Sequence, residues 1–292
     1  MNRGSTLRED GYCVLPGVLD AGMLRALELF AERRLARESA DHFDRFRFHG
    51  SMLPLDWRAE PLVRRLVAWQ RTLKGLAALG FERPRWLSGY LISKPPRAPS
   101  LWWHQDWWAW DDPATEMVAP PQMFVMFYLR DVDESSGCLR VIPGSHRRAH
   151  PLHAALPPAH SEEINSASQG VAHASHPDEV AVRARAGDAV VGDVRLLHAT
   201  YPNNCDRRRT CLTLWYLPAY DALPGTIKSY VINHPSLPPP GWWRDRPRSV
   251  PRQMRSLLPT YDGDAAPADY ERTPTAAWIS GGDHAGVERT SA

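Results

Sequence analysis

A histidine and an aspartate stand two positions apart inside a tryptophan-rich stretch, which reads Trp102-Trp103-His104-Gln105-Asp106-Trp107-Trp108. In an extended strand, the side chains at i and i+2 point to the same side of the chain. The imidazole of His104 and the carboxylate of Asp106 can therefore converge on one ion. A lone His-x-Asp pair also occurs by chance in many proteins, so the pair requires support from elsewhere in the sequence.

That support comes from a second histidine and an arginine further along the chain. An apolar run from Gly187 to Asp193 leads to His198, and Arg209 follows at the start of another strand-like run. With His104 and Asp106, His198 would place two histidines and one carboxylate on one face of a metal ion. Three coordination positions stay open, which suits a non-haem Fe(II) ion that must bind a co-substrate and O₂.

The segments that must position these residues are short and strand-like. Gly, Pro, Asn and Asp separate them, a texture typical of β-sandwiches and barrels. The predicted strands cover residues 11–19, 86–93, 123–129, 137–142, 179–185, 189–194 and 210–217. The segment 150–177 is rich in Ala, His, Ser and Pro and is expected to be a long excursion between strands.

Two helices are predicted between the first and the second of these strands. Asp20 is a suitable N-cap for an apolar pattern that runs from Met23 to Ala31. A second pattern runs from Pro61 to Leu79 and ends at Gly80, with proline in its first turn and glycine after its end, as helix capping favours. We expect both helices to brace a sheet.

Composition limits the possible partners. The chain has 292 residues, and its formal net charge of +2 is far from the dense positive field of a nucleic-acid-binding protein. No apolar run is long enough for a membrane span, and the N-terminus lacks a signal-peptide pattern. Four cysteines without a C-x-x-C pair indicate neither a disulfide framework nor a zinc knuckle. We expect one cytoplasmic domain that acts on a small molecule, without nucleic-acid or membrane partners; the sequence leaves the oligomeric state open.

Four blocks of sequence, in order, resemble the phytanoyl-CoA dioxygenase family of Fe(II)- and 2-oxoglutarate-dependent oxygenases. They are residues 90–96, the motif 104–106, residues 137–146 and residues 187–209, with a weaker match over 7–35. The resemblance implies a mainly β fold, a double-stranded β-helix (jelly roll, cupin-like) with supporting N-terminal helices. The single oxygenase domain 1–292 would have its core at about 86–217, helical support at 7–80 and a partly irregular C-terminal extension at 235–292.

The resemblance also implies roles for individual residues. His104, Asp106 and His198 would hold iron. Arg209 would pair with the distal carboxylate of 2-oxoglutarate, because a guanidinium group fits a carboxylate bidentately. Thr200 would offer its hydroxyl to the same carboxylate.

Further residues of the implied site are less closely tied to one role. Gln105 and Tyr90 occupy positions that approach the co-substrate in the family, and Met126 occupies a wall position where some relatives carry tryptophan. Trp107, Trp108 and Trp110 either fill the core or form an aromatic wall for a bulky, partly apolar substrate. His146, in the turn Pro143-Gly144-Ser145-His146, is interpreted as a turn residue and not as a metal ligand.

The implied activity is hydroxylation of an unactivated C–H bond in a small molecule, while 2-oxoglutarate and O₂ are converted to succinate and CO₂. The resemblance implies a role for this reaction in natural-product biosynthesis. Desaturation, epoxidation, epimerisation or cyclisation with the same cofactors stays open. A non-catalytic jelly-roll binding protein is the alternative from another class. Related halogenases replace the metal-binding Asp by Ala or Gly, so Asp106 argues against halogenation.

Overall fold

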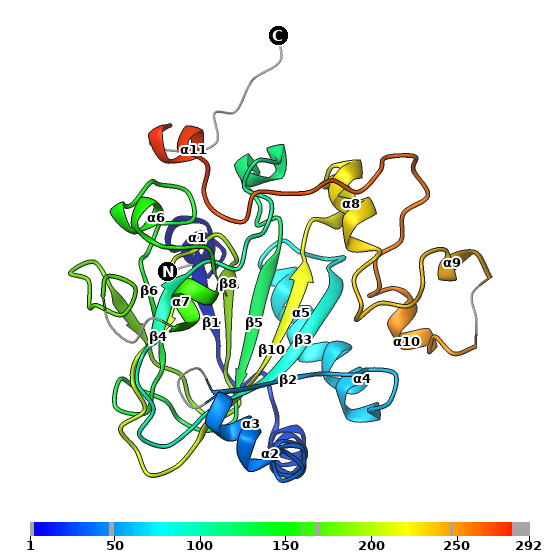
Figure 1. Cartoon of the computed structure of the whole chain (residues 1–292). Coiled ribbons are helices and arrows are strands. Elements are labelled where there is room, and N and C mark those ends of the chain that lie inside the picture. Colours follow the sequence, from blue (N-terminus) through cyan, green and yellow to red (C-terminus); the bar gives the residue numbers. More distant parts are fainter. Residues whose placement is uncertain (1–2, 47–49, 160, 167–169, 246–247, 282–292) are drawn as a thin grey trace.

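Six antiparallel strands form the larger of two sheets in the computed structural model (Figure 1). The structure describes residues 3–46, 50–159, 161–166, 170–245 and 248–281. The strand order is β1-β8-β5-β10-β3-β2. These strands are β1 (Tyr12–Leu15), β2 (Ser51–Pro54), β3 (Arg85–Lys94), β5 (Met123–Tyr128), β8 (Ala189–Asp193) and β10 (Arg209–Leu217).

The smaller sheet has the order β4-β9-β6-β7 and is also antiparallel. Its strands are β4 (Leu101–His104), β6 (Leu139–Val141), β7 (Val180–Val182) and β9 (His198–Thr200). Two antiparallel sheets joined by crossing connections form the expected jelly roll. The segment expected as helical support also contributes strands, because β1 pairs with β8 and β2 pairs with β3.

The expected strands from 86 to 217 are all present, with ends that differ by a few residues. The short strands β2, β4 and β9 lie outside the predicted strand ranges, although His104, which ends β4, was expected on an extended strand. The excursion between β6 and β7 is not wholly irregular. It contains the short helices α6 (Pro151–Ala155) and α7 (Glu162–Ser166).

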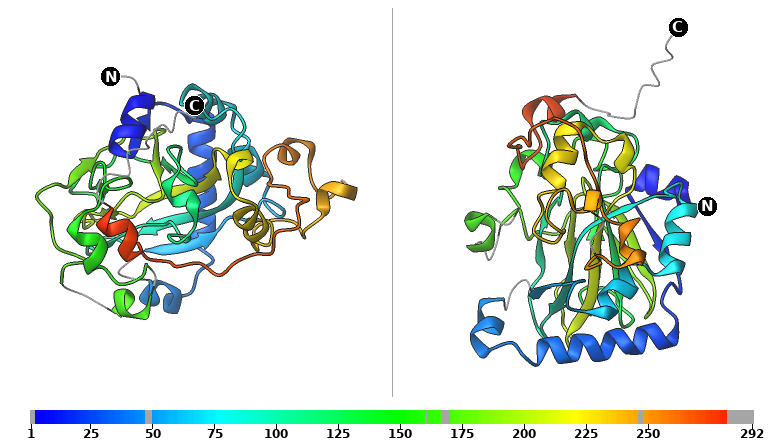
Figure 2. Two further views of the ribbon diagram at one scale, coloured as in Figure 1. Left: turned by 90° about the horizontal axis from the view of Figure 1, so that it is seen from above. Right: turned by 90° about the vertical axis from the view of Figure 1, so that its right-hand side faces the viewer.

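Helix α2 (Ala21–Leu35) forms as predicted, and the Asp20 side chain accepts a hydrogen bond from the backbone N–H of Met23. It runs across the lower end of the molecule in the right-hand view of Figure 2. The single helix expected over 61–79 was wrong, since the chain forms α4 (Pro61–Val67) and α5 (Gln70–Ala78). Trp69 has an extended backbone there and donates its indole N–H to the Val18 carbonyl at 2.8 Å, which separates the two helices.

The remaining elements surround the sheets (Figure 2). They are α1 (Arg3–Asp10), α3 (Ala40–Arg45), η1 (Pro113–Glu116), η2 (Tyr220–Ala222), α8 (Gly225–Val231), α9 (Trp242–Asp245), α10 (Arg252–Arg255) and α11 (Ala276–Ser280). The segment leading to α11 crosses the upper end of the sheets in Figure 1. The expected C-terminal extension thus has only short helices, and its residues 246–247 and 282–292 lie outside the described part.

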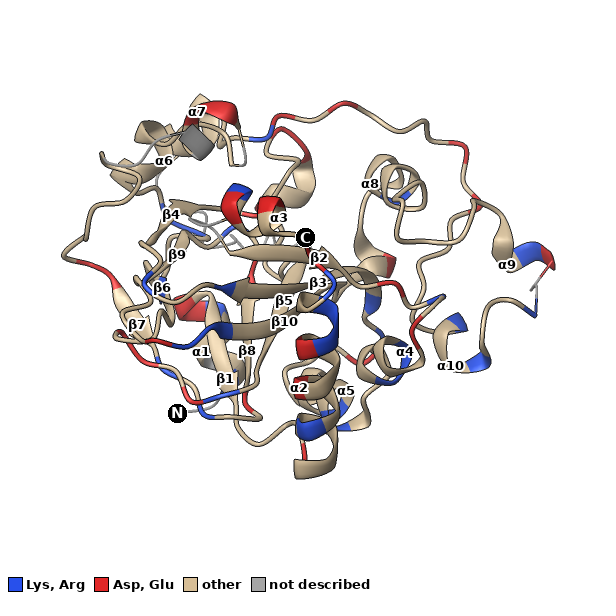
Figure 3. Ribbon diagram, turned by 60° about the horizontal axis from the view of Figure 1, so that its bottom comes forward, with Lys and Arg blue, Asp and Glu red and all other residues tan. Residues whose placement is uncertain are grey.

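The core lies between the sheets and under α2, α4 and α5. Every side chain of β5 and β8 is buried. Charged residues of both signs lie mostly on the helices and loops around the sheets (Figure 3). The four cysteines are free thiols. Within the described ranges, none of the helices is both long enough and apolar enough to cross a lipid bilayer.

Candidate active site

Pairing of two short strands brings the two histidines of the predicted triad together. His104 ends β4 and His198 begins β9, and the two residues are direct partners in the antiparallel ladder. Side chains at such a position lie on the same face of the sheet. The two buried imidazole rings are accordingly 4.1 Å apart between their centroids.

Asp106 completes the triad from beyond the end of β4. Its carboxylate places Oδ1 3.8 Å from His104 Nε2 and Oδ2 3.9 Å from His198 Nε2. The expectation that His104 and Asp106 share one extended strand was wrong, because the strand ends at His104. Instead, the backbone N–H groups of Asp106 and Trp107 both donate to the Val194 carbonyl, at 2.9 and 3.1 Å. These bonds anchor the chain after β4 against the segment that leads to β9.

The hydrogen bonds of the imidazoles fix which nitrogen faces the carboxylate. His104 Nδ1 lies 3.0 Å from the Trp102 carbonyl, and His198 Nδ1 lies 3.0 Å from the Leu196 carbonyl. A carbonyl oxygen only accepts, so each neutral ring carries its proton on Nδ1 and presents the Nε2 lone pair to Asp106. All three ligand atoms lie within 4.8 Å of one another. Two imidazole nitrogens and a carboxylate in this arrangement fit one divalent transition-metal ion.

Two aromatic side chains hold the triad in place. The Trp215 indole N–H donates to Asp106 Oδ2 at 3.0 Å. The Phe124 ring lies 5.2 Å from the His198 ring, between centroids. Phe124 also covers its ladder partner Gly192, where an added Cβ would lie 2.1 Å from the ring. A side chain at that position would push Phe124 toward the histidine.

The triad opens into a cavity of about 450 Å³, which we name the first cavity. Alternate residues of β10, Arg209, Thr213 and Trp215, form part of its wall. The Thr213 hydroxyl is buried without a hydrogen-bond partner among the described residues. The full lining comprises Arg45, Phe46, Met52, Ile92, Leu101, Trp102, His104, Asp106, Phe124, Met126, Leu139, His198, Thr200, Arg209, Thr213 and Trp215.

Arg209 lines this cavity, and a second buried basic residue, Lys94, contacts the lining residue Thr200. Arg209 is 6% exposed and donates from Nε to the Gly137 carbonyl at 3.0 Å. Lys94 is 1% exposed and donates from Nζ to Thr200 Oγ1 at 2.8 Å and to the Tyr201 carbonyl at 2.9 Å. Burial, together with the charges of Arg209 and Arg140, holds the pKa of Lys94 well below its ordinary value. Among the described residues, no carboxylate forms an ion pair with Arg209, so an anion entering the cavity would meet an unpaired guanidinium charge.

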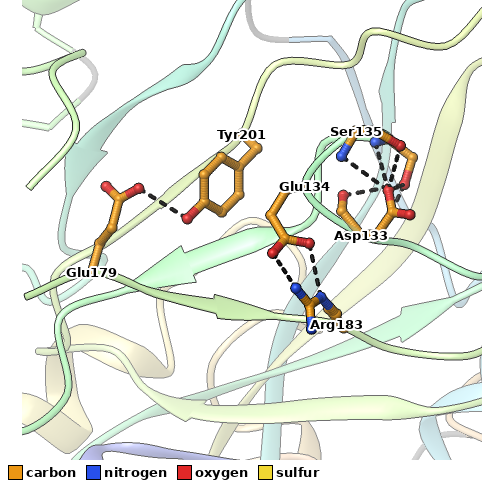
Figure 4. A network of polar contacts seen from close by, with 7 residues as sticks. Asp133, Glu134, Ser135, Glu179, Arg183 and Tyr201 are labelled. Carbon is orange, nitrogen blue, oxygen red and sulfur yellow. Dashed lines mark hydrogen bonds and ion pairs between the residues drawn. The ribbon is translucent and has the colours of Figure 1, made fainter.

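A polar network fixes the chain around these two basic residues (Figure 4). The Asp133 carboxylate accepts from Ser135 and Ser136 and shapes the turn before Gly137. These hydrogen bonds keep the pKa of Asp133 below its ordinary value, and the bond from the Ser135 hydroxyl has the largest effect. Glu134 pairs with Arg183 beyond the end of β7. The turn that presents the Gly137 carbonyl to Arg209 is thereby tied to the smaller sheet.

On the other side of this network, Glu179 connects the smaller sheet to Tyr201. The Tyr201 hydroxyl donates to Glu179 Oε1 at 2.9 Å, and Arg140 pairs with Glu179 Oε2 at 3.0 Å. The Arg140 guanidinium also lies 4.6 Å from the centroid of the Trp103 ring. The Glu179 carboxylate is thus engaged by both Arg140 and Tyr201.

A second cavity, of about 560 Å³, adjoins Asp106 and Trp215. Phe46, Met52, Asp106 and Trp215 line both cavities. The other residues of the second cavity are Leu87, Ser88, Tyr90, Gln105, Trp107, Trp108, Gln122, Ala159, Tyr230, Val231, His234 and Arg272.

The structure divides the remaining predicted site residues between these cavities. Thr200, Met126 and Arg209 line the first cavity with the triad. Gln105 and Tyr90 line the second cavity, and Gln105 Nε2 donates to the Arg195 carbonyl at 3.1 Å. The three tryptophans that follow the motif also lie in different places in the structure.

Trp107 and Trp108 line the second cavity. Trp110 lies in neither wall and is 3% exposed. Its ring packs edge-on against Trp278 of α11, with centroids 5.0 Å apart. Trp110 therefore contributes to the core around the C-terminal segment.

Other histidines lie away from the triad. His146 is 3% exposed, and its Nε2 donates to the Arg8 carbonyl at 3.1 Å, which fastens α1 to the turn after β6. His150, His176 and Asp178 form a second cluster with ligand atoms within 4.8 Å. However, His150 Nδ1 accepts from the Leu152 N–H and His176 Nδ1 accepts from the Asp178 N–H, so these rings are already engaged in local turns.

Sequence reasoning did not identify Trp215, Lys94, Tyr230, His234 or Arg272 as site residues. Lys94 stood inside the block 90–96, and its place in a strand among apolar residues could have marked it as a buried cation. The position of Trp215 gave a weaker indication of a site, namely that it shares one face of β10 with Arg209 and Thr213. The last three residues come from the segment after β10, and nothing in their spacing indicated a site.

Comparison with known proteins agrees with this geometry. The family model described as phytanoyl-CoA dioxygenase (PhyH) matches residues 7–211. The chain belongs to this family. No curated protein sequence matches it significantly.

Several solved structures share the fold of this phytanoyl-CoA dioxygenase family member. The non-haem α-ketoglutarate-dependent epimerase SnoN from nogalamycin biosynthesis is 23% identical, with a TM-score of 0.55 over 74% of this chain and 81% of that chain. HygX from Streptomyces hygroscopicus, with nickel and 2-oxoglutarate bound, is 19% identical, with a TM-score of 0.57 over 74% and 86%. The non-haem monooxygenase ThoJ, a nickel complex, is 22% identical, with a TM-score of 0.51 over 74% and 76%.

Proposed function

We propose that this protein is an Fe(II)- and 2-oxoglutarate-dependent oxygenase that hydroxylates an unactivated C–H bond of a small, partly apolar molecule. The observation that carries the proposal is the shared cavity of the His104, Asp106 and His198 triad and the buried Arg209. Membership of the family supports the cofactor class. HygX and SnoN, which have been crystallised with 2-oxoglutarate bound, share the fold.

The triad would hold the iron, with the two Nε2 atoms and Asp106 as ligands and the opposite face open to the first cavity. Iron bound there, with 2-oxoglutarate and O₂, supplies the oxidising power to cleave a C–H bond and insert one oxygen atom, as 2-oxoglutarate becomes succinate and CO₂. The chain's own contribution is to fix the ligands, orient the co-substrate and exclude water.

Arg209 would bind the distal carboxylate of 2-oxoglutarate, and Thr200 would donate its hydroxyl to the same group. Lys94 supports that role, because its Nζ already donates to Thr200 Oγ1. The oxygen of Thr200 is therefore engaged as an acceptor, and its own proton can point to a bound carboxylate. Met126 would limit the width of the cavity beside the co-substrate.

Gln105, Tyr90, Trp107 and Trp108 would act from the second cavity, on the organic substrate. We assign Trp110 no contact with substrate, since it packs on Trp278. SnoN is an epimerase from nogalamycin biosynthesis, which favours natural-product biosynthesis as the setting.

The same cofactors would also support epimerisation, desaturation, epoxidation or cyclisation, and the epimerase SnoN shares the fold. Product mass separates these outcomes. Hydroxylation adds one oxygen, desaturation removes two hydrogens, and epimerisation leaves the mass unchanged. An oxygenase of this kind converts some 2-oxoglutarate to succinate in the absence of the organic substrate, whereas a non-catalytic binding protein would not.

The first test is an anaerobic titration of metal-free protein with Fe(II) and then 2-oxoglutarate. We expect the weak visible charge-transfer band of a chelated iron–keto-acid complex in the wild type and its loss in His198→Ala. The matched control His176→Ala removes a histidine of the other His/Asp cluster and should keep the band. Absence of the band in folded wild-type protein, or its persistence in His198→Ala, would overturn the proposal.

A further inference from the structure

The two cavities meet at the metal-binding carboxylate. Asp106 and Trp215 line both of them, whereas Arg209 and Thr200 line only the first. A molecule in the second cavity would therefore reach the triad while the Arg209 end of the first cavity holds the co-substrate. The second cavity has the position that an organic substrate requires.

Aromatic rings dominate the walls of the second cavity. Six of its lining side chains are aromatic: Phe46, Tyr90, Trp107, Trp108, Trp215 and Tyr230. Trp108 stacks on Tyr230 with centroids 4.4 Å apart and an interplanar angle of 24°, and Tyr90 meets Trp215 edge-on at 5.8 Å. Flat rings gain most from such surfaces, because offset-stacked and edge-to-face contacts add to the burial of apolar area.

Hydrogen bonds hold these rings before any ligand enters. Trp108 donates its indole N–H to Gln122 Oε1 at 2.9 Å, and Trp107 donates to Thr115 Oγ1 at 2.9 Å. Trp215 is fixed by Asp106. A preformed aromatic surface favours rigid flat ligands, since little side-chain freedom is lost on binding.

Hydrogen-bond donors lie in the part of the second cavity that the first cavity does not share. His234 Nδ1 accepts from the Ser236 N–H, so a neutral His234 carries its proton on Nε2, and burial lowers the pKa of this ring. The Arg272 guanidinium lies beside the Tyr230 hydroxyl, at 3.4 Å. Both side chains offer protons to an oxygen atom of a ligand.

We propose that the second cavity binds the organic substrate, and that this substrate is a flat, fused-ring molecule with an acceptor oxygen directed to His234 and Arg272. Placement beside the metal rests on the proposed function. The ring-binding surface itself does not, because it is built from residues that hold no metal.

A matched pair of probes tests the shape preference. Naphthalene-2-sulfonate and camphor-10-sulfonate carry the same anionic group on ten-carbon skeletons, but only the naphthalene rings are flat. We expect calorimetric titration of the full chain, loaded anaerobically with Fe(II) and 2-oxoglutarate, to show naphthalene-2-sulfonate binding about tenfold more tightly or better. Equal affinities, or tighter binding of the camphor probe, would overturn the inference.

Variants then locate the binding surface. Trp108→Leu and Tyr230→Leu should each weaken naphthalene-2-sulfonate binding about tenfold. Trp243→Leu removes a tryptophan of α9 outside both cavities and serves as control. Binding that is unchanged in both leucine variants would reject this site.

The two proposals fail separately. If the Fe(II)–2-oxoglutarate band forms but the flat probe does not bind, the substrate class is wrong and the oxygenase assignment stands. If the band does not form but metal-free protein binds the flat probe through Trp108, the ring-binding surface stands and the proposed function is wrong.

Discussion

The indole N–H of Trp215 donates a 3.0 Å hydrogen bond to Oδ2 of Asp106. This bond ties the only predicted carboxylate ligand to a residue that lines both cavities. Groups that hold a metal ligand in its orientation contribute strongly to metal affinity, although they never touch the ion.

Trp215→Phe should therefore weaken metal binding about tenfold or more, because phenylalanine keeps an aromatic ring but loses the donor. Anaerobic titration with Fe(II) measures the dissociation constant. Trp243→Phe is a close control, since the Trp243 indole N–H donates to the Asp262 carboxylate at 2.9 Å outside both cavities. Equal metal affinity in wild type and Trp215→Phe would contradict this role.

Arg209→Ala should raise the 2-oxoglutarate concentration needed for half-maximal succinate formation by about 10- to 100-fold, the range expected for a charge-assisted hydrogen bond. Its neighbour Arg208 provides the control. Arg208 points to the other side of the sheet, where it donates to Ser93 and Ser51. The half-saturating concentration should be unchanged in Arg208→Ala, and a similar rise in both variants would indicate a structural effect.

Lys94→Met should also raise the 2-oxoglutarate requirement, by about tenfold, because Thr200 loses the donor that orients its hydroxyl. Thr200→Val removes the other partner of the same bond. If the two residues act together, the double variant will be less impaired than the sum of the single effects predicts. Strictly additive free energies would show that Lys94 and Thr200 act independently.

Stability should fall in mild acid because of His146. Burial first, and then the charge of Arg195, lower the pKa of His146 from 6.5 to about 4, although Asp193 opposes this. The unfolded chain therefore binds a proton at a higher pH than the folded chain does. The contribution of His146 to the free energy of unfolding is fully present above pH 6.5. It is lost as the pH falls toward 4, and the loss amounts to up to about 3 kcal/mol.

Urea unfolding at several pH values checks this prediction by comparison of wild type with His146→Asn. The free energy of unfolding should fall less steeply between pH 6.5 and 4 in the variant. Parallel curves for the two proteins would mean that other groups carry the acid sensitivity.

The triad could be predicted from sequence because His198, Arg209 and three further blocks accompany the His104–Asp106 pair, which alone would be too common to identify a site. The second cavity could not, since Trp108 and Tyr230 meet only in the folded chain. Local spacing also misplaced Asp106 on a strand. Two hydrogen bonds to the Val194 carbonyl, a contact distant in sequence, determine where this carboxylate lies.

The helix expected over 61–79 failed for a similar reason. Its apolar periodicity is continuous, yet the indole of Trp69 bonds to the Val18 carbonyl and the chain breaks there into α4 and α5. A tertiary contact of this kind overrides helix propensity, which contributes only tenths of a kcal/mol per residue.

Backbone contacts orient both histidines of the triad: they are ladder partners, and each ring is bonded to the carbonyl two residues before it. Tyr230, His234 and Arg272, in contrast, come from the segment after the last strand. The triad and this part of the wall of the second cavity thus come from separate parts of the chain, although Asp106 and Trp215 line both cavities. Exchange of the segment after β10 for that of a relative would change this part of the wall and leave β4 and β9, which carry the two histidines, in place.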